Sequence, residues 1–177
     1  MPAASHATSQ PQRQPLPAWR WVRHDDAAGF SVRIPLGWRV QASSWGEIAI
    51  SEPGGSAAVL VRTRKLAAGA GLEAWLRDDF PATEPGLHNV RLLEVQAHSA
   101  QLVRAAFDYG SNVFQGSARM VAVREENLTT LFVAAAARAE FAQRQPALVE
   151  ILDSLRYAPG PGRHFHHRLR QAGWSMG

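Results

Sequence analysis

The stretch that decides the fold of this chain is Gly29-Phe-Ser-Val-Arg-Ile-Pro-Leu-Gly-Trp38. Residues 30, 32 and 34 are large and apolar, whereas residues 31 and 33 are polar, an alternation typical of a strand with one buried face. Pro35 ends such a strand because it has no backbone N–H to donate, and Gly37 permits the turn into Trp38. The stretch therefore predicts a strand and a tight turn, and it contains no catalytic motif.

The same alternation recurs between residues 19 and 136. It predicts further strands at residues 19–24, 38–42, 47–51, 57–64, 90–96, 101–109, 113–124 and 128–136. Short polar or glycine-rich turns separate them, so we expect a meander of antiparallel strands. In the later strands, residues 103, 105, 107 and 109 share one face, and residues 114, 116, 118, 120 and 122 share another.

Two segments show helical spacing of apolar residues instead. In residues 71–80 the side chains of Leu72, Trp75, Leu76 and Phe80 occur at helical spacing, and Pro81 is expected to close the helix. Residues 140–157 carry an apolar stripe at positions 148, 151, 152 and 155, with Pro146 expected in the first turn. The predicted fold class is α+β, an antiparallel β-sheet of about six to eight strands flanked by helices.

Composition divides the chain into three parts. Residues 1–18 are rich in Pro, Gln, Ala and Ser and are expected to be a disordered leader or linker. Residues 19–158 are expected to form a single domain, and residues 159–177, which follow a Pro-Gly-Pro-Gly break, to be a flexible basic tail. The Arg- and Ala-rich wording favours a bacterial origin, in the cytoplasm or exported with a signal absent from this chain.

Charge and cysteine content exclude several classes of function. All 15 acidic residues lie between residues 19 and 158, where 15 basic residues balance them, so the net charge of +4 comes from outside that range. A balanced domain argues against specific nucleic-acid binding, which needs basic side chains gathered on one face. The absence of cysteine rules out disulfides, thiol catalysis and cysteine-ligated metals. The longest apolar runs are too short for a transmembrane helix.

The order of these elements resembles the PsbP/DcrB-like superfamily. The resemblance rests on the Gly-Phe-Ser-Val-x-Ile-Pro-x-Gly-Trp opening, a strand hairpin, a short helix near residues 72–80, three long strands and a closing helix that ends in Ile151-Leu-Asp-Ser-Leu-Arg156. It covers residues 19–157. The superfamily includes photosystem II subunits, bacterial lipoproteins, secretion chaperones and an import factor that binds the GTPase Ran. It implies an antiparallel sheet flanked by helices and a bias toward protein binding, with no catalytic residue carried over.

Potential reactive groups do not form a recognisable motif. Serine, histidine and aspartate occur at Ser99, His98, His88 and Asp108, but no nucleophile elbow frames a serine. The adjacent carboxylates at 78–79 and 125–126 are expected to diverge into solvent. His164, His166 and His167 are the densest metal-capable group, yet the arginines around them oppose a cation. A weak attraction of this tail to anionic lipid or nucleic acid is a further alternative. No catalytic residue, cofactor or metal site is therefore predicted.

The tryptophans supply the candidate interface. Trp38 and Trp75 lie in patterned elements and are expected in the core, whereas Trp45, Trp19 and Trp21 lie at strand ends or in a loop. We therefore expect a non-catalytic binding or accessory module that engages a protein partner, a further domain or a small ligand through a sheet face or edge loops. The alternatives are an enzyme with a site assembled from scattered residues and a structural subunit of an envelope or secretion complex.

Overall fold

A computed structural model describes residues 19–42, 47–67, 69–84 and 86–157. The predicted leader and basic tail lie outside the described residues. The described elements are, in chain order, β1 (Trp21–Asp26), β2 (Phe30–Pro35), β3 (Arg39–Ala42), β4 (Ile48–Ser51), β5 (Ala57–Lys65), α1 (Leu72–Asp78), α2 (Phe80–Thr83), β6 (His88–Ser99), β7 (Leu102–Gly110), β8 (Gln115–Glu125), β9 (Leu128–Ala137), α3 (Arg138–Asp153) and β10 (Arg156–Tyr157).

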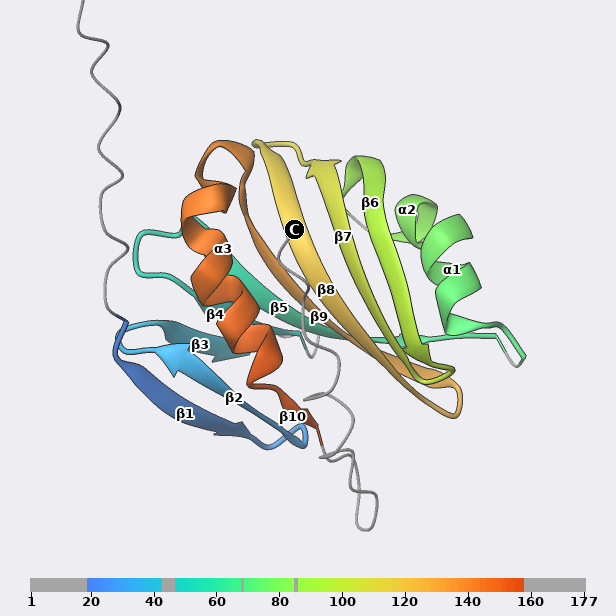
Figure 1. Cartoon of the computed structure of the whole chain (residues 1–177), viewed down its shortest axis with the longest axis horizontal. Helices are drawn as coiled ribbons and strands as arrows, with labels where there is room; N and C mark the ends of the chain where they lie inside the picture. The colour runs from blue at the N-terminus through green and yellow to red at the C-terminus, as the bar shows by residue number, and fades with distance from the viewer. Residues whose placement is uncertain (1–18, 43–46, 68, 85, 158–177) are drawn as a thin grey trace, which may run out of the picture.

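The larger of the two sheets has seven antiparallel strands in the order β3-β4-β5-β9-β8-β7-β6 (Figure 1). All neighbours in this sheet follow one another along the chain except β5 and β9, which pair from Ala57 opposite Ala136 to Lys65 opposite Leu128. The insertion of α1, α2 and β6–β8 between these two strands places β9 in the middle of the sheet. These hairpin connections confirm the predicted antiparallel α+β class.

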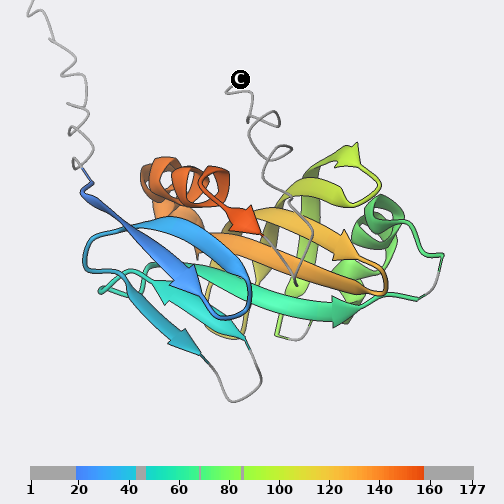
Figure 2. The same ribbon diagram turned by 90° about the horizontal axis from the view of Figure 1, so that it is seen from below.

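The smaller sheet joins the two ends of the described chain. Its order is β1-β2-β10, with Arg156 opposite Ser31 and Tyr157 opposite Phe30. Gly29 turns β1 into β2 with a φ of 87°, and the backbone N–H of Ala28 donates to Asp26 Oδ1 at 2.8 Å. In Figure 2 the β1–β2 hairpin (blue) lies next to α3 (orange). The smaller sheet and α3 therefore form one layer against the larger sheet.

Both faces of the larger sheet contribute to the core. On one face, α3 and the smaller sheet enclose a cluster that includes Phe30, Phe132 and Leu148. On the other face, α1 and α2 cover β6–β8 in a second cluster that includes Leu76 and Phe107. Successive residues of β7, β8 and β9 supply the two clusters in turn, because neighbouring side chains on a strand point to opposite faces. The predicted common face of residues 103, 105, 107 and 109 belongs to the second cluster.

Two predictions for the N-terminal half need correction. The expected single meander is divided, because β2 pairs with β1 and β10 in a separate sheet and not with β3. The helix expected at residues 71–80 ends at Asp78, and Pro81 lies in the first turn of α2 instead of closing α1. Proline is tolerated there because the first N–H groups of a helix need no intrahelical partner. Trp38 is buried as predicted, and Trp75 is partly buried against the second cluster.

The C-terminal segment also differs from its prediction. The helix begins at Arg138 and ends at Asp153, so Pro146 lies inside it and Tyr157 lies in β10. An internal proline removes one helical hydrogen bond. The burial of Ala147, Leu148, Ile151 and Leu152 around it offsets that cost. Within the described residues, no helix has the length and apolar content needed to cross a bilayer.

Candidate functional site

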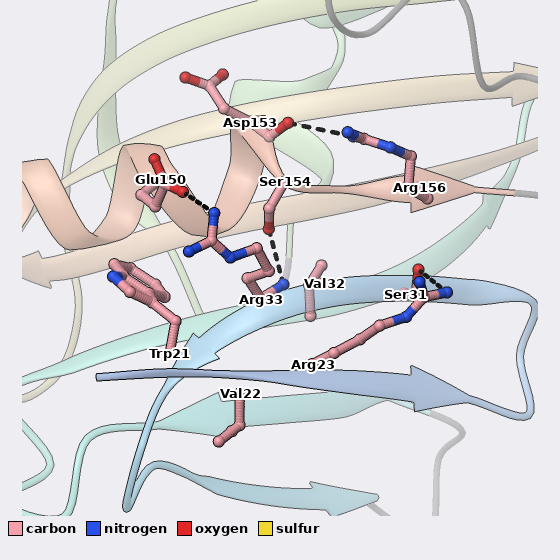
Figure 3. A pocket seen from close by; sticks show the side chains of 10 residues that line it. All are labelled: Trp21, Val22, Arg23, Ser31, Val32, Arg33, Glu150, Asp153, Ser154 and Arg156. Atoms are coloured by element: carbon pink, nitrogen blue, oxygen red, sulfur yellow. Dashed lines mark hydrogen bonds and ion pairs between the residues drawn. The ribbon is translucent and has the colours of Figure 1, made fainter. Parts of the chain in front are cut away.

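A groove of about 720 Å³ lies between the β1–β2 hairpin and the C-terminal end of α3 (Figure 3). Residues 21–23 of β1 and 31–33 of β2 line it on one side. Residues 150 and 153 of α3, together with residues 154 and 156, line it on the other. The volume lies within the roughly 300–1,000 Å³ of typical ligand pockets, but the lining is rich in charged side chains.

Arg33 joins the two sides of the groove. Its Nη1 lies 2.9 Å from Glu150 Oε1, and its backbone N–H donates to Ser154 Oγ at 2.8 Å. Its guanidinium carbon lies 5.5 Å from the centre of the Trp21 ring, in a cation–π contact. Exposed ion-pair and cation–π contacts each contribute at most about 1 kcal/mol, and here one guanidinium contacts both the Trp21 ring of β1 and Glu150 of α3.

Ser31 is flanked by two further arginines. In the smaller sheet it stands opposite Asp25 of β1 on one side and Arg156 of β10 on the other. The Nη2 of Arg23 donates to Ser31 Oγ at 3.3 Å, and its Nε donates to Asp25 Oδ1 at 2.8 Å. The Nη1 of Arg156 donates to the backbone carbonyl of Leu155 at 2.9 Å. Figure 3 shows Arg23 directed toward Ser31, and Trp21 and Arg33 on the same side of the hairpin.

The far wall of the groove is fixed to the larger sheet by buried polar contacts. The guanidinium of Arg104, fully buried on β7, pairs with Asp153 Oδ1 at 2.9 Å. The hydroxyls of Tyr157 and Thr130 share a buried hydrogen bond of 3.0 Å, and burial raises the pKa of Tyr157 above 10.0. Tyr157 therefore stays protonated at neutral pH, and these two contacts fix the wall to β7 and β9.

The hydroxyl groups of the groove have structural roles. Ser31 Oγ accepts a hydrogen bond from Arg23, whereas Ser154 Oγ accepts one from the backbone of Arg33 and donates to the carbonyl of Ile151 at 2.8 Å. No histidine is among the residues that line the groove. A serine nucleophile needs a base within hydrogen-bond reach, which neither serine has among the described side chains. The arrangement is suited to binding anions and aromatic or apolar groups.

The three predicted interface tryptophans have different outcomes. Trp21 lines the groove and packs partly against the first core cluster. Trp19 is partly buried just before β1 and does not line it. Trp45 lies outside the described residues, so its role stays a prediction. Sequence reasoning missed the arginines at positions 23, 33 and 156; the outward positions of residues 31 and 33 were the only local signal.

The scattered serine, histidine and aspartate side chains do not meet in a triad. His88 Nε2 lies 2.9 Å from Asn112 Oδ1. Asp108 accepts a hydrogen bond from Ser117 at 2.6 Å and pairs with Arg138. Burial, and then the charge of Arg104, lower the pKa of His98 below 6.5, so this histidine is neutral at pH 7. The described residues contain no group of three metal-capable side chains, and the histidine cluster of the tail lies outside them.

Comparison with known proteins places the fold but not the activity. No protein-family model and no curated protein matches the chain. Among solved structures, cyanobacterial PsbP (CyanoP) from Synechocystis sp. PCC 6803 is similar, with a TM-score of 0.57 and 10% identity over 82% of this chain and 97% of that one. PA94 from Pseudomonas aeruginosa, described as a protein of unknown function and putative regulator, has a TM-score of 0.52 and 14% identity, covering 80% of this chain and 99% of that one. The chain has a PsbP-like α+β fold, which confirms the resemblance found in the sequence.

Proposed function

We propose that this chain is a non-catalytic binding module that engages a protein partner at the groove between the β1–β2 hairpin and α3. The observation that carries the proposal is the pairing of a partly exposed aromatic ring, Trp21, with a charged groove whose hydroxyls are all engaged in structural hydrogen bonds. Tryptophan and arginine are the side chains most enriched where protein interfaces gain their binding energy. A rigid groove of this kind binds with little loss of conformational entropy.

The groove is built for recognition more than for catalysis. Its charged groups are oriented by contacts that a reaction would disturb, including the pair of Arg33 with Glu150 and that of Asp153 with Arg104. Its walls come from the two ends of the described chain, so a bound partner would brace the hairpin against α3. Trp45, which lies outside the described residues, stays a separate proposed partner contact.

A site-specific photocrosslink tests this function. Benzoylphenylalanine replaces Trp21, an aromatic for an aromatic, and the variant is irradiated in cells of the source organism before mass spectrometry. Lys65, exposed at the end of β5, is the control position. We expect a discrete protein adduct at position 21 that is missing at position 65. Identical adducts at both positions, or none at position 21 in a folded protein, would contradict the proposal.

A further inference from the structure

We propose that the segment bound in this groove is an extended acidic peptide stretch of the partner, whose carboxylates are received by Arg23 and Arg156 on either side of Ser31. This inference rests on the proposed function, because it names the chemistry of the partner at the same groove. It is carried by the distribution of charge within the groove and by the register of the three strands of the smaller sheet.

The accessible charge of the groove is positive. Arg23, Arg33 and Arg156 line it, against two carboxylates. Glu150 is already paired with Arg33, and the Oδ1 of Asp153 pairs with the buried Arg104. Figure 3 shows the carboxylate of Asp153 directed away from the hairpin. The two acidic groups are therefore engaged, and their charge does not cancel that of the two outer arginines.

Neither outer arginine is strongly held by a carboxylate. Arg23 pairs with Asp25 at 2.8 Å, but the two side chains are 68% and 66% exposed, and such surface pairs are worth less than about 1 kcal/mol. The described contacts of Arg156 are to the backbone carbonyls of residues 153 and 155. A guanidinium has several N–H donors arranged as a fork that matches a carboxylate. Both groups therefore keep donors for an incoming anion.

The strand register brings these two arginines to one small area. Arg156 is opposite Ser31 of β2, and Arg23 is opposite Arg33, which follows Ser31 by two residues on the same strand. Neighbouring antiparallel strands place opposed Cα atoms about 4.5–5.5 Å apart, so Arg23 and Arg156 flank β2 on the same face. Ser31 between them is only 8% exposed, and the Nη2 of Arg23 lies 3.3 Å from its Oγ. An extended peptide with acidic residues at positions i and i+2 directs both carboxylates to one side, at a spacing of about 6.6 Å.

A peptide fits this groove better than a nucleic acid does. The basic and acidic residues of the range 19–158 balance, whereas binding to a phosphate backbone needs many basic side chains that follow it. The Trp21 ring beside Arg33 offers a contact for an apolar or aromatic side chain next to the acidic pair. The preferred ligand is therefore a short segment with two acidic residues and one large apolar residue.

The test uses the full chain and defined probes. A blocked heptapeptide with two glutamates at i and i+2 and one leucine is titrated into ¹⁵N-labelled protein at about 50 mM salt. The same peptide with glutamines, and inorganic phosphate, are separate arms. We expect saturable shifts of the amides of Ser31, Arg33 and Arg156 with the acidic peptide. The dissociation constant should rise about tenfold or more in Arg23→Glu. It should rise as much in Arg156→Gln, which keeps a side-chain N–H donor but removes the positive charge.

Lys65→Glu is the matched control, since it makes the same charge change as Arg23→Glu at an exposed site outside the groove. Equal weakening by Lys65→Glu would mean non-specific attraction and would overturn the inference. Equal binding of the glutamine peptide would also overturn it while leaving the groove as a partner site. If phosphate produces the same shifts with similar affinity, the ligand of the groove is a small anion and not a peptide, which overturns the inference. If the acidic peptide gives no saturable shift but position 21 gives a discrete crosslink, the inferred acidic ligand is wrong and the proposed function stands.

Discussion

Replacing Gly116 with alanine should destabilise the protein through one steric conflict. Gly116 lies on β8 opposite Tyr109 of β7, and the Tyr109 ring lies across the place of the missing side chain. An alanine Cβ at this position would lie 2.3 Å from Tyr109 Cζ and 2.5 Å from its hydroxyl oxygen. Those distances are far below van der Waals contact, so the tyrosine ring must move. The φ of Gly116 imposes no strain of its own, so the ring alone decides the outcome.

The expected loss is about 1–2 kcal/mol in the free energy of unfolding. Overpacking a well-packed interior costs about 1–3 kcal/mol, and the smaller backbone entropy of alanine returns about 0.5–1 kcal/mol. Tyr109 is only 7% exposed and contacts the ring of Phe107 at 5.9 Å between centroids and that of Phe114 at 6.2 Å. A displaced ring loses these contacts. For a domain of this size the melting temperature should fall by roughly 3–8 °C.

Urea denaturation and thermal melts of four variants measure this effect: Gly116→Ala, Gly54→Ala, Tyr109→Leu and the double variant of Tyr109→Leu with Gly116→Ala. Gly54→Ala is the control, because nothing lies within 4 Å of its added Cβ and its backbone is not in the left-handed region. It should change stability by less than about 0.5 kcal/mol. In a Tyr109→Leu background, Gly116→Ala should be nearly neutral. A wild-type stability for Gly116→Ala, or an equal loss in both backgrounds, would refute the steric explanation. The affinity of the acidic peptide should not change, because Tyr109 belongs to the core cluster on the face away from α3.

Three further predictions concern the core and the wall of the groove. The pKa of folded His98 lies below 6.5, so the unfolded chain takes up a proton first, and the free energy of unfolding should fall as the pH drops below about 6.5. His98→Gln should weaken that pH dependence in urea titrations at pH 7.5 and 5.5. An unchanged pH dependence in the variant would contradict the prediction. Asp153→Ala removes a partner of the buried Arg104 and should lower the free energy of unfolding by about 1–3 kcal/mol, and Asp153→Asn should lower it less. Equal stability of both variants and the wild type would contradict a stabilising role of the Arg104–Asp153 pair. Trp38→Ala, at a buried position, should lower the free energy of unfolding by about 3–5 kcal/mol, measured by thermal or urea unfolding, and Trp21→Ala should lower it far less. Similar losses in the two variants would place Trp21 in the core instead of the groove.

Local pattern determined much of the fold because strand alternation and turn chemistry act over a few residues. The turn from Pro35 to Trp38, the common face of Phe107 and Tyr109, and the antiparallel order of β6–β9 all follow from it. The same pattern placed Ser31 and Arg33 on the outer face of β2. No ligand-binding motif accompanies them, so the sequence indicated a binding module without locating its site.

Only the tertiary structure determined which distant residues Ser31 and Arg33 contact. Arg33 meets Glu150 and Ser154, and Ser31 meets Arg156, all more than a hundred residues further along the chain. No local period records such pairings, because they depend on how α3 packs and where β10 ends. For the same reason the separate smaller sheet and the proline inside α3 escaped prediction: each is stabilised by burial against distant strands. The sequence by itself therefore determined the elements and their outward faces, and long-range packing brought two of those faces together as the groove.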